Sequence, residues 1–175
     1  MKYIISLFVL TNTIHLFAQS MKPGDSLVNI GQYQQAITEY KKERKPELYK
    51  IAKAYEALDN YEEAILFYEK IREKDTLNLK VNFQYALALL HNNDIRAIQV
   101  LEHLVEKNES DIYYYYLGLA YEKQKNYTKA IENWQASRKL NPDYFKSVYK
   151  LSLQLANMQQ LDTSLEIANA FLENH

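Results

Sequence analysis

The sequence contains no cysteine, only three glycines and three prolines, and no excess of either charge. Without cysteine the chain cannot form disulfides, thiolate metal sites or a cysteine-linked lipid anchor. The 21 lysines and arginines are balanced by 22 aspartates and glutamates, so no basic surface that would bind nucleic acid is expected. Apolar residues make up 47% of the chain and charged residues 25%, which is typical of a folded protein.

Motifs of catalysis and of metal binding are missing as well. The sequence has no glycine-rich phosphate loop, no nucleophile elbow and no cluster of carboxylates at useful spacing. His91 and His103 fall on different expected helices, and neither has a second ligand four residues away. We therefore expect a protein that is not an enzyme, with no cofactor, no metal site and no small-molecule substrate.

The N-terminal stretch is typical of an export signal. Lys2 precedes an apolar run that is broken by polar residues, and the small residue Ala18 stands before polar sequence. This pattern predicts a signal peptide over residues 1–18 that is cleaved after Ala18. The alternative is an uncleaved membrane anchor, which needs about 20 predominantly apolar residues. We expect an exported protein, either periplasmic or secreted.

From residue 25 onward the apolar residues recur at helical spacing. Tyr114, Leu117, Gly118 and Tyr121 stand at i, i+3, i+4 and i+7, and a second helical pattern follows after a polar turn with Asn126 as its expected cap. This helical hairpin recurs along the chain. The small residue of its first helix is Ala52, Ala86, Gly118 or Ser152, which gives separations of 34, 32 and 34 residues.

These positions resemble the tetratricopeptide repeat, a helix–turn–helix unit of 34 residues. The residues that match its pattern are Tyr114, Leu117, Gly118, Tyr121, Ala130, Trp134 and Pro142. The resemblance implies an all-α fold, a right-handed superhelical stack of antiparallel helix pairs. It places repeats at approximately 45–78, 79–110, 111–144 and 145–175, after a truncated helix pair over residues 19–44 that acts as a cap.

The first and last units are expected to depart from the pattern. Ala36 and Ala52 are only 16 residues apart, so the helix that holds Ala36 must end before Pro46. Gly24 and Gly31 are predicted at turns, which would leave Gly118 as the one glycine inside a helix. Leu165 is predicted on the packed face of the last helix, and no further helix follows to cover that repeat.

Four consecutive tyrosines, Tyr113 to Tyr116, must point in different directions on a helix. Tyr114 shares the face of Leu117 and is predicted to be core, while Tyr113 and Tyr116 are predicted to cover neighbouring helices. Tyr115 stands three residues before a small position, and every repeat has an aromatic residue at that place. This column is the most informative feature outside the expected core.

The resemblance implies that the first helices line a concave groove, in which aromatic residues would hold the apolar anchors of a peptide. The alternative is that these rings only pack against one another. We expect an interaction scaffold, in a bacterial cell-envelope assembly, that binds a protein or peptide segment; the alternative is a structural subunit that associates, with itself or a larger subunit, through its C-terminal hairpin. The predicted groove residues are Tyr49, Lys53, Phe83, Leu87, Tyr115, Leu119, Glu122, Tyr149 and Leu153.

Overall fold

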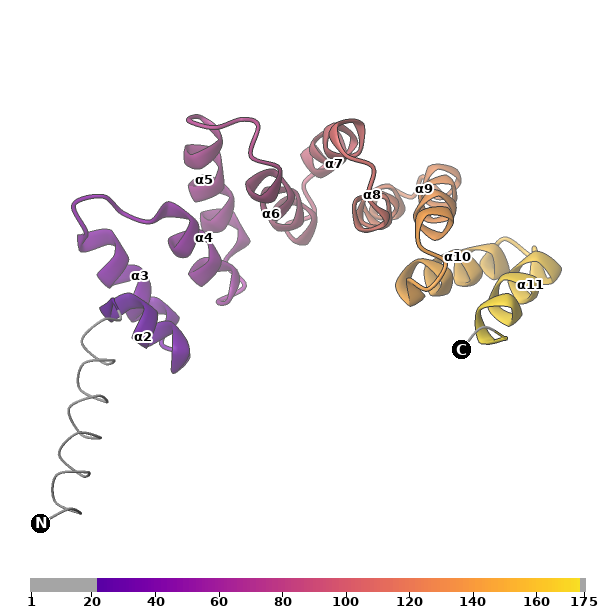
Figure 1. Cartoon of the computed structure of the whole chain (residues 1–175), viewed down its shortest axis with the longest axis horizontal. Helices are drawn as coiled ribbons and strands as arrows, with labels where there is room; N and C mark the ends of the chain where they lie inside the picture. Colours follow the sequence, from indigo (N-terminus) through magenta and orange to yellow (C-terminus); the bar gives the residue numbers. More distant parts are fainter. Residues whose placement is uncertain (1–21, 174–175) are drawn as a thin grey trace, which may run out of the picture. The chain divides into compact units, whose positions relative to one another are not determined.

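The computed structural model describes residues 22–173, and every regular element in this range is an α-helix (Figure 1). The predicted all-α class is therefore confirmed, whereas the predicted signal peptide lies outside the described residues. The helices are α2 (Pro23–Asn29), α3 (Tyr33–Lys42), α4 (Leu48–Glu56), α5 (Tyr61–Arg72), α6 (Leu79–His91), α7 (Arg96–Lys107), α8 (Asp111–Lys123), α9 (Tyr127–Leu140), α10 (Phe145–Asn157) and α11 (Leu161–Leu172).

The helices belong to two compact units, and the boundary between residues 67 and 68 falls inside α5. In the first unit α2 packs on α3 and α3 packs on α4. In the second unit each helix from α6 to α11 packs on the next one along the chain. Each unit is thus a local stack of helix hairpins, in which the contacts are between close neighbours in sequence.

The hairpin turns share one backbone conformation. A single residue in each turn has a left-handed φ between 55° and 75°. The amide that follows this residue bonds back to the carbonyl five residues earlier, at 2.8 to 3.0 Å, which ends the first helix as a Schellman motif. The left-handed residues are Gly31, Asp59, Asn93, Lys125 and Gln159. Each lies seven residues after a small residue, and for Gly31 that residue is Gly24.

Gly24 is a correction to the sequence prediction, because it lies inside α2 and not at a turn. A Cβ on Gly24 would lie 2.6 Å from Cδ1 of Tyr40. Gly118 has the same relation to Trp134, at the same distance and the same sequence separation of 16 residues. Both glycines let a large ring approach the helix backbone. The first helix pair therefore keeps the small-to-large contact of the full repeats, although α2 is short.

The predicted helix limits are confirmed at two places. Helix α3 ends at Lys42, before Pro46, as the short spacing from Ala36 to Ala52 requires. Helix α9 begins after Asn126, whose side-chain oxygen accepts a hydrogen bond from the Lys129 amide at 3.2 Å. Such caps satisfy amide groups that have no partner inside the helix.

Candidate protein-binding surfaces

The first helices of the second unit, α6, α8 and α10, lie side by side. The ring of Phe83 on α6 is 5.0 Å from that of Tyr113 and 5.4 Å from that of Tyr116, both on α8. Between α8 and α10, the Lys150 ammonium contacts the Glu122 carboxylate at 2.8 and 3.1 Å. The predicted covering of a neighbouring helix by Tyr113 and Tyr116 is confirmed.

Tyr115 is buried, with 8% of its surface exposed, so its predicted place in an open groove is wrong. Its ring lies between those of Tyr116, at 5.1 Å, and Tyr144, at 5.3 Å. Burial raises the pKa of the Tyr115 hydroxyl, and it raises that of Tyr144 to about 12. At this position the rings pack against one another, which was the alternative to ligand binding.

Tyr114 was predicted to be part of the core, but it is only half-buried. The core around it consists of Leu117 and Tyr121, which are buried as expected, and of Tyr115. Adjacent residues on a helix are about 100° apart, so two large neighbouring rings can both reach the edge of one packed face. Which of the two neighbours is buried depends on the segment packed against that edge, which here is the turn before α10 that carries Tyr144.

The other predicted groove residues of the second unit remain accessible. Phe83, Leu87, Leu119 and Glu122 are half-buried, while Tyr149 and Leu153 are 52% and 41% exposed. We call these six residues the first-helix face, since they lie on α6, α8 and α10. Its most open part is at α10.

Phe145 extends this face and was missed by the sequence reasoning. It is 57% exposed, and its ring stacks on that of Tyr149 with the centroids 5.9 Å apart. Phe145, Tyr149 and Leu153 stand at i, i+4 and i+8 on α10, so they form one stripe. That spacing can be read from the sequence, but the predicted aromatic column includes only the position three residues before each small residue, and Phe145 stands four residues before that position.

Tyr49 and Lys53, the remaining predicted groove residues, lie on α4 in the first unit. They line a recess of about 350 Å³ that has mostly apolar walls. Lys53 is exposed and forms an ion pair with Glu56. The recess is lined by Asp25, Val28, Tyr33, Tyr40, Tyr49, Lys50, Lys53 and Ala54.

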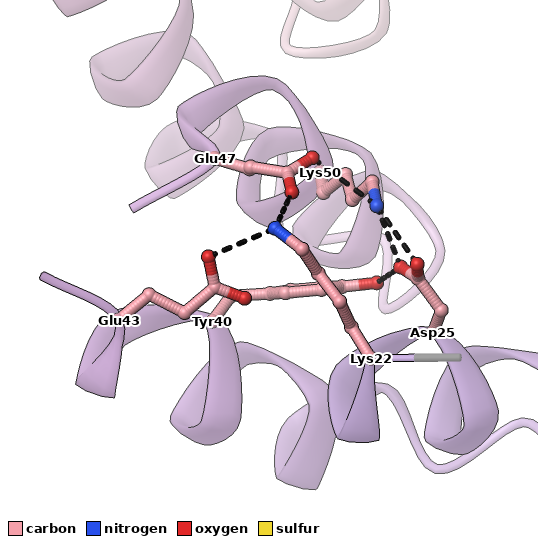
Figure 2. A network of polar contacts seen from close by, with 6 residues as sticks. All are labelled: Lys22, Asp25, Tyr40, Glu43, Glu47 and Lys50. Carbon is pink, nitrogen blue, oxygen red and sulfur yellow. Dashed lines mark hydrogen bonds and ion pairs between the residues drawn. The ribbon is translucent and has the colours of Figure 1, made fainter. Parts of the chain in front are cut away.

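A polar network holds one wall of this recess in place (Figure 2). Asp25 on α2 accepts hydrogen bonds from the Tyr40 hydroxyl at 2.6 Å and from the Lys50 ammonium at 2.8 and 2.9 Å. The Lys50 bond, and then the Tyr40 bond, lower the pKa of Asp25 below its usual value. Burial and the bond to Asp25 raise the pKa of Tyr40. The network links α2, α3 and α4.

Lys22 continues the network at the start of α2. Its ammonium contacts Glu43, at 3.1 Å, and Glu47 (Figure 2). Glu47 also pairs with Lys50 at 3.1 Å. The bond from Lys22 and then that from Lys50 lower the pKa of Glu47. These partly exposed pairs fix the position of a helix that is only seven residues long.

A polar recess of about 470 Å³ in the second unit contains several titratable groups, including His103. Three of its lining residues, Arg72, Tyr85 and Arg96, take part in contacts that hold helices together. The Glu69 carboxylate accepts hydrogen bonds from the Tyr85 hydroxyl at 2.9 Å and from Arg96 at 2.8 Å. Burial and the bond to Glu69 raise the pKa of Tyr85, which keeps its hydroxyl protonated. The Arg72 guanidinium stacks 4.3 Å above the Tyr85 ring.

The outer face of α11 carries large apolar side chains in contact with solvent. Leu161 and Leu165 are each 59% exposed, and Leu172 is 69% exposed. Leu165 was predicted on the packed face of the last helix, and that prediction is wrong. The equivalent Ile98 and Ile131 are half-buried, because α8 packs on α7 and α10 packs on α9. We call Leu161, Leu165 and Leu172 the α11 stripe.

Comparison with known protein families identifies the repeat. Models of the tetratricopeptide repeat match residues 48–75 and residues 112–144. The chain is a tetratricopeptide-repeat protein. The two matched segments cover α4 with α5 and α8 with α9, where the predicted repeat pattern is most complete. No curated protein sequence matches the chain significantly.

Solved structures of MamA proteins have the same fold as this tetratricopeptide-repeat protein. MamA from Desulfovibrio magneticus RS-1 has a TM-score of 0.77 at 23% identity, over 86% of this chain and 89% of that one. A second MamA crystal structure has a TM-score of 0.78 at 24% identity, over 87% and 94% of the two chains. MamA AMB-1 matches with a TM-score of 0.69 at 18% identity. The expected solenoid fold is confirmed, and at these identities the likeness shows the fold alone.

Tetratricopeptide repeats support a protein–protein interaction scaffold, and scaffolds of this kind are in general not enzymes. Among residues 22–173, no group of three or more His, Asp or Glu side chains is placed to hold a metal ion. Within the same range, no helix combines the length and the apolar character needed to cross a membrane.

Proposed function

We propose that this tetratricopeptide-repeat protein binds a peptide or protein segment across its first-helix face. The observation that carries the proposal is the exposure of Tyr149 and Leu153 on α10, beside the stacked ring of Phe145. A folded chain in water tends to bury rings of this size, and clustered exposed apolar side chains mark sites of association.

The chemistry of the face suits a segment with apolar anchors. Phe145 and Leu153 are eight residues apart on α10, so the stripe is about 12 Å long. A partner can place two or three apolar side chains along that length. The ion pair of Lys150 with Glu122 lies beside the stripe and offers polar groups at its border. Aromatic side chains contribute large contact areas with few rotatable bonds.

The recess in the first unit offers a second binding point, separate from the first-helix face. Tyr49 and Tyr33 supply aromatic walls, and Ala54 and Val28 supply aliphatic ones. A recess of this volume accommodates one large apolar side chain. Lys53, at its border, can reach a carboxylate of the partner. We propose that each unit contributes its own anchoring point.

The place of action is proposed to be the bacterial cell envelope, as part of an assembly outside the cytoplasm. This proposal rests on the N-terminal sequence, with cleavage after Ala18 and release to the periplasm or the medium. Cell fractionation followed by mass spectrometry of the mature N-terminus tests it. A cytoplasmic protein that starts at Met1 would contradict the proposal.

The binding proposal is tested by crosslinked pull-down of the mature protein beside a Tyr149→Ala, Leu153→Ala double variant. The control is Leu77→Ala, which changes a residue that is 74% exposed between α5 and α6. Proteins recovered with the parent and the control but lost with the double variant are ligands of the first-helix face. Recovery of the same proteins by all three chains argues against this face.

A second candidate function is that of a structural subunit that joins another subunit through the C-terminal hairpin, α10 with α11. The exposure of Leu165 and Leu172 favours it. Size-exclusion chromatography of the purified chain over a range of concentrations separates the two functions. A mass that rises with concentration, and falls back in Leu165→Glu, supports self-association through this hairpin.

A further inference from the structure

The α11 stripe is accompanied by a second stripe of one charge. Asp162 and Glu166 follow Leu161 and Leu165 directly, and Glu173 follows Leu172. All three carboxylates are exposed, and none has an ion-pair partner among the residues that the structure describes. No lysine or arginine occurs after Lys150 in the whole sequence.

The two stripes occupy different parts of the helix surface. At about 100° per residue, the three leucines and Ala168 fall within an arc of about 60°, and the carboxylates lie roughly 100° away from its centre. The residues that pack on α10, such as Ser164 and Ile167, are on the other side of the leucines. Around α11 the order is therefore buried face, exposed apolar stripe, acidic stripe.

The structure shows how the same apolar position is covered in the repeat before. Helix α10 packs on α9, where Ile131, the equivalent of Leu165, is half-buried and Trp134, the equivalent of Ala168, is fully buried. Lys150 of α10 lies 5.8 Å above the Trp134 ring and also reaches Glu122. The covering element is thus a helix that brings apolar side chains together with a lysine. Nothing within residues 22–173 takes that place on α11.

We infer that the C-terminal hairpin docks an amphipathic α-helix of another polypeptide whose polar border is rich in lysine or arginine. The apolar face of that helix covers the α11 stripe, and its cations meet Asp162, Glu166 and Glu173. Complementary charge sets the partner and the direction of approach. The inference deepens the second candidate function and does not depend on the first-helix face.

The charge of the acidic stripe favours a basic helix over a second copy of this chain as the partner of α11. If two copies paired α11 against α11 in antiparallel order, the two acidic stripes would lie on the same side of the helix pair, and like charges at an interface are unfavourable. A basic helix converts the same carboxylates into ion pairs. About 16 Å of helix separates Leu161 from Leu172, so a partner helix of three to four turns covers the stripe.

The test uses a designed 14-residue helical peptide with leucines on one face and lysines elsewhere, and a twin in which every lysine is glutamate. Binding to the full chain is measured by fluorescence anisotropy at two salt concentrations. We expect the lysine peptide to bind at least about tenfold more tightly than its twin, and to weaken as salt rises. Equal affinities for the two peptides would overturn the inference.

Variants locate the binding. Leu165→Glu is expected to lower the affinity for the lysine peptide about tenfold or more, whereas Leu77→Glu, at an exposed site outside the hairpin, leaves it unchanged. The Asp162→Asn, Glu166→Gln, Glu173→Gln variant should remove most of the salt dependence. Because these side chains are exposed, circular dichroism of each variant should match the parent.

Two outcomes separate this inference from the proposed functions. If the peptide is lost in the Tyr149→Ala, Leu153→Ala variant and kept in Leu165→Glu, it binds the first-helix face, and the inference is wrong while the first function stands. If light scattering shows a dimer that Leu165→Glu dissociates, a second copy occupies the stripe. The hairpin is then an interface, but its partner chemistry is not the one inferred.

Discussion

Replacing Tyr115 and Tyr149 by alanine, each in its own variant, tests the distinction between core and surface at one repeat position. Tyr115 is 8% exposed and Tyr149 is 52% exposed, although both stand three residues before a small residue of their helix. A buried tyrosine removes about 200 Å² from water, worth about 5 kcal/mol as an upper estimate. Alanine keeps part of that burial, so Tyr115→Ala should cost about 3–4 kcal/mol.

The same reasoning gives a smaller effect for Tyr149→Ala. About half of that side chain is already in water, so the loss is about 1–2 kcal/mol, including its stacking on Phe145. Thermal and urea unfolding followed by far-ultraviolet circular dichroism measures both variants. For a chain of this size the expected fall in Tm is about 10 °C for Tyr115→Ala and about 4 °C for Tyr149→Ala.

Tyr115→Phe is the control for the hydroxyl group. No described residue forms a hydrogen bond with the Tyr115 hydroxyl, so its removal should change the free energy of unfolding by less than about 0.5 kcal/mol. The reasoning is refuted if Tyr115→Ala and Tyr149→Ala destabilise the protein equally. A small effect of Tyr115→Ala alone would show that the ring belongs to an open groove after all.

Three further predictions follow from the packing, the turns and the ion pairs. Gly118→Ala should lower the free energy of unfolding by about 1–2 kcal/mol in urea titration, because its Cβ would meet the buried Trp134 ring, and the helix propensity of alanine offsets only part of that strain. Lys125→Gly should raise the same free energy by up to about 1 kcal/mol, because Lys125 has a left-handed φ of 59°; an unchanged midpoint would contradict this. Lys50 lowers the pKa of Asp25 in the folded state. The ionised Asp25 carboxylate therefore stabilises the fold above about pH 4, and this stabilisation is lost as the pH falls through the lowered pKa. Amide hydrogen exchange should show α2 losing protection as the pH falls below about 4. Asp25→Asn should reduce that pH dependence, and the part that remains belongs to Glu47, whose pKa is lowered by Lys22 and Lys50.

The fold could be predicted from the sequence because each repeat has a pattern of small and apolar residues within about 34 consecutive positions. The spacing of Ala52, Ala86, Gly118 and Ser152 reports where helices must approach closely, and the structure has a helix hairpin around each of them. Gly24 shows the limit of that reasoning. The seven-residue helix that holds it has too few residues for a periodic pattern, and only its contact with Tyr40 reveals that it occupies the same position.

The candidate surfaces were predicted less well than the fold. The column of aromatic residues was found correctly in sequence, but its members range from buried Tyr115 to exposed Tyr149. Their environments depend on neighbouring elements that the repeat pattern does not specify, such as the turn that carries Tyr144. For α11 the sequence pattern predicted only that no further helix covers the last repeat, and it did not predict the exposed leucines or the carboxylates beside them.

The sequence by itself determined the helices, their pairing and the chemistry of a chain without cysteine or an excess of charge, because these follow from spacing along one helix and from composition. Only the tertiary structure decided which rings are sealed and which meet water. That outcome depends on which helix or turn packs against each side chain, and residues distant in sequence supply those elements. Tyr115 and Leu165 were therefore assigned to the wrong environments, one to solvent and one to the core.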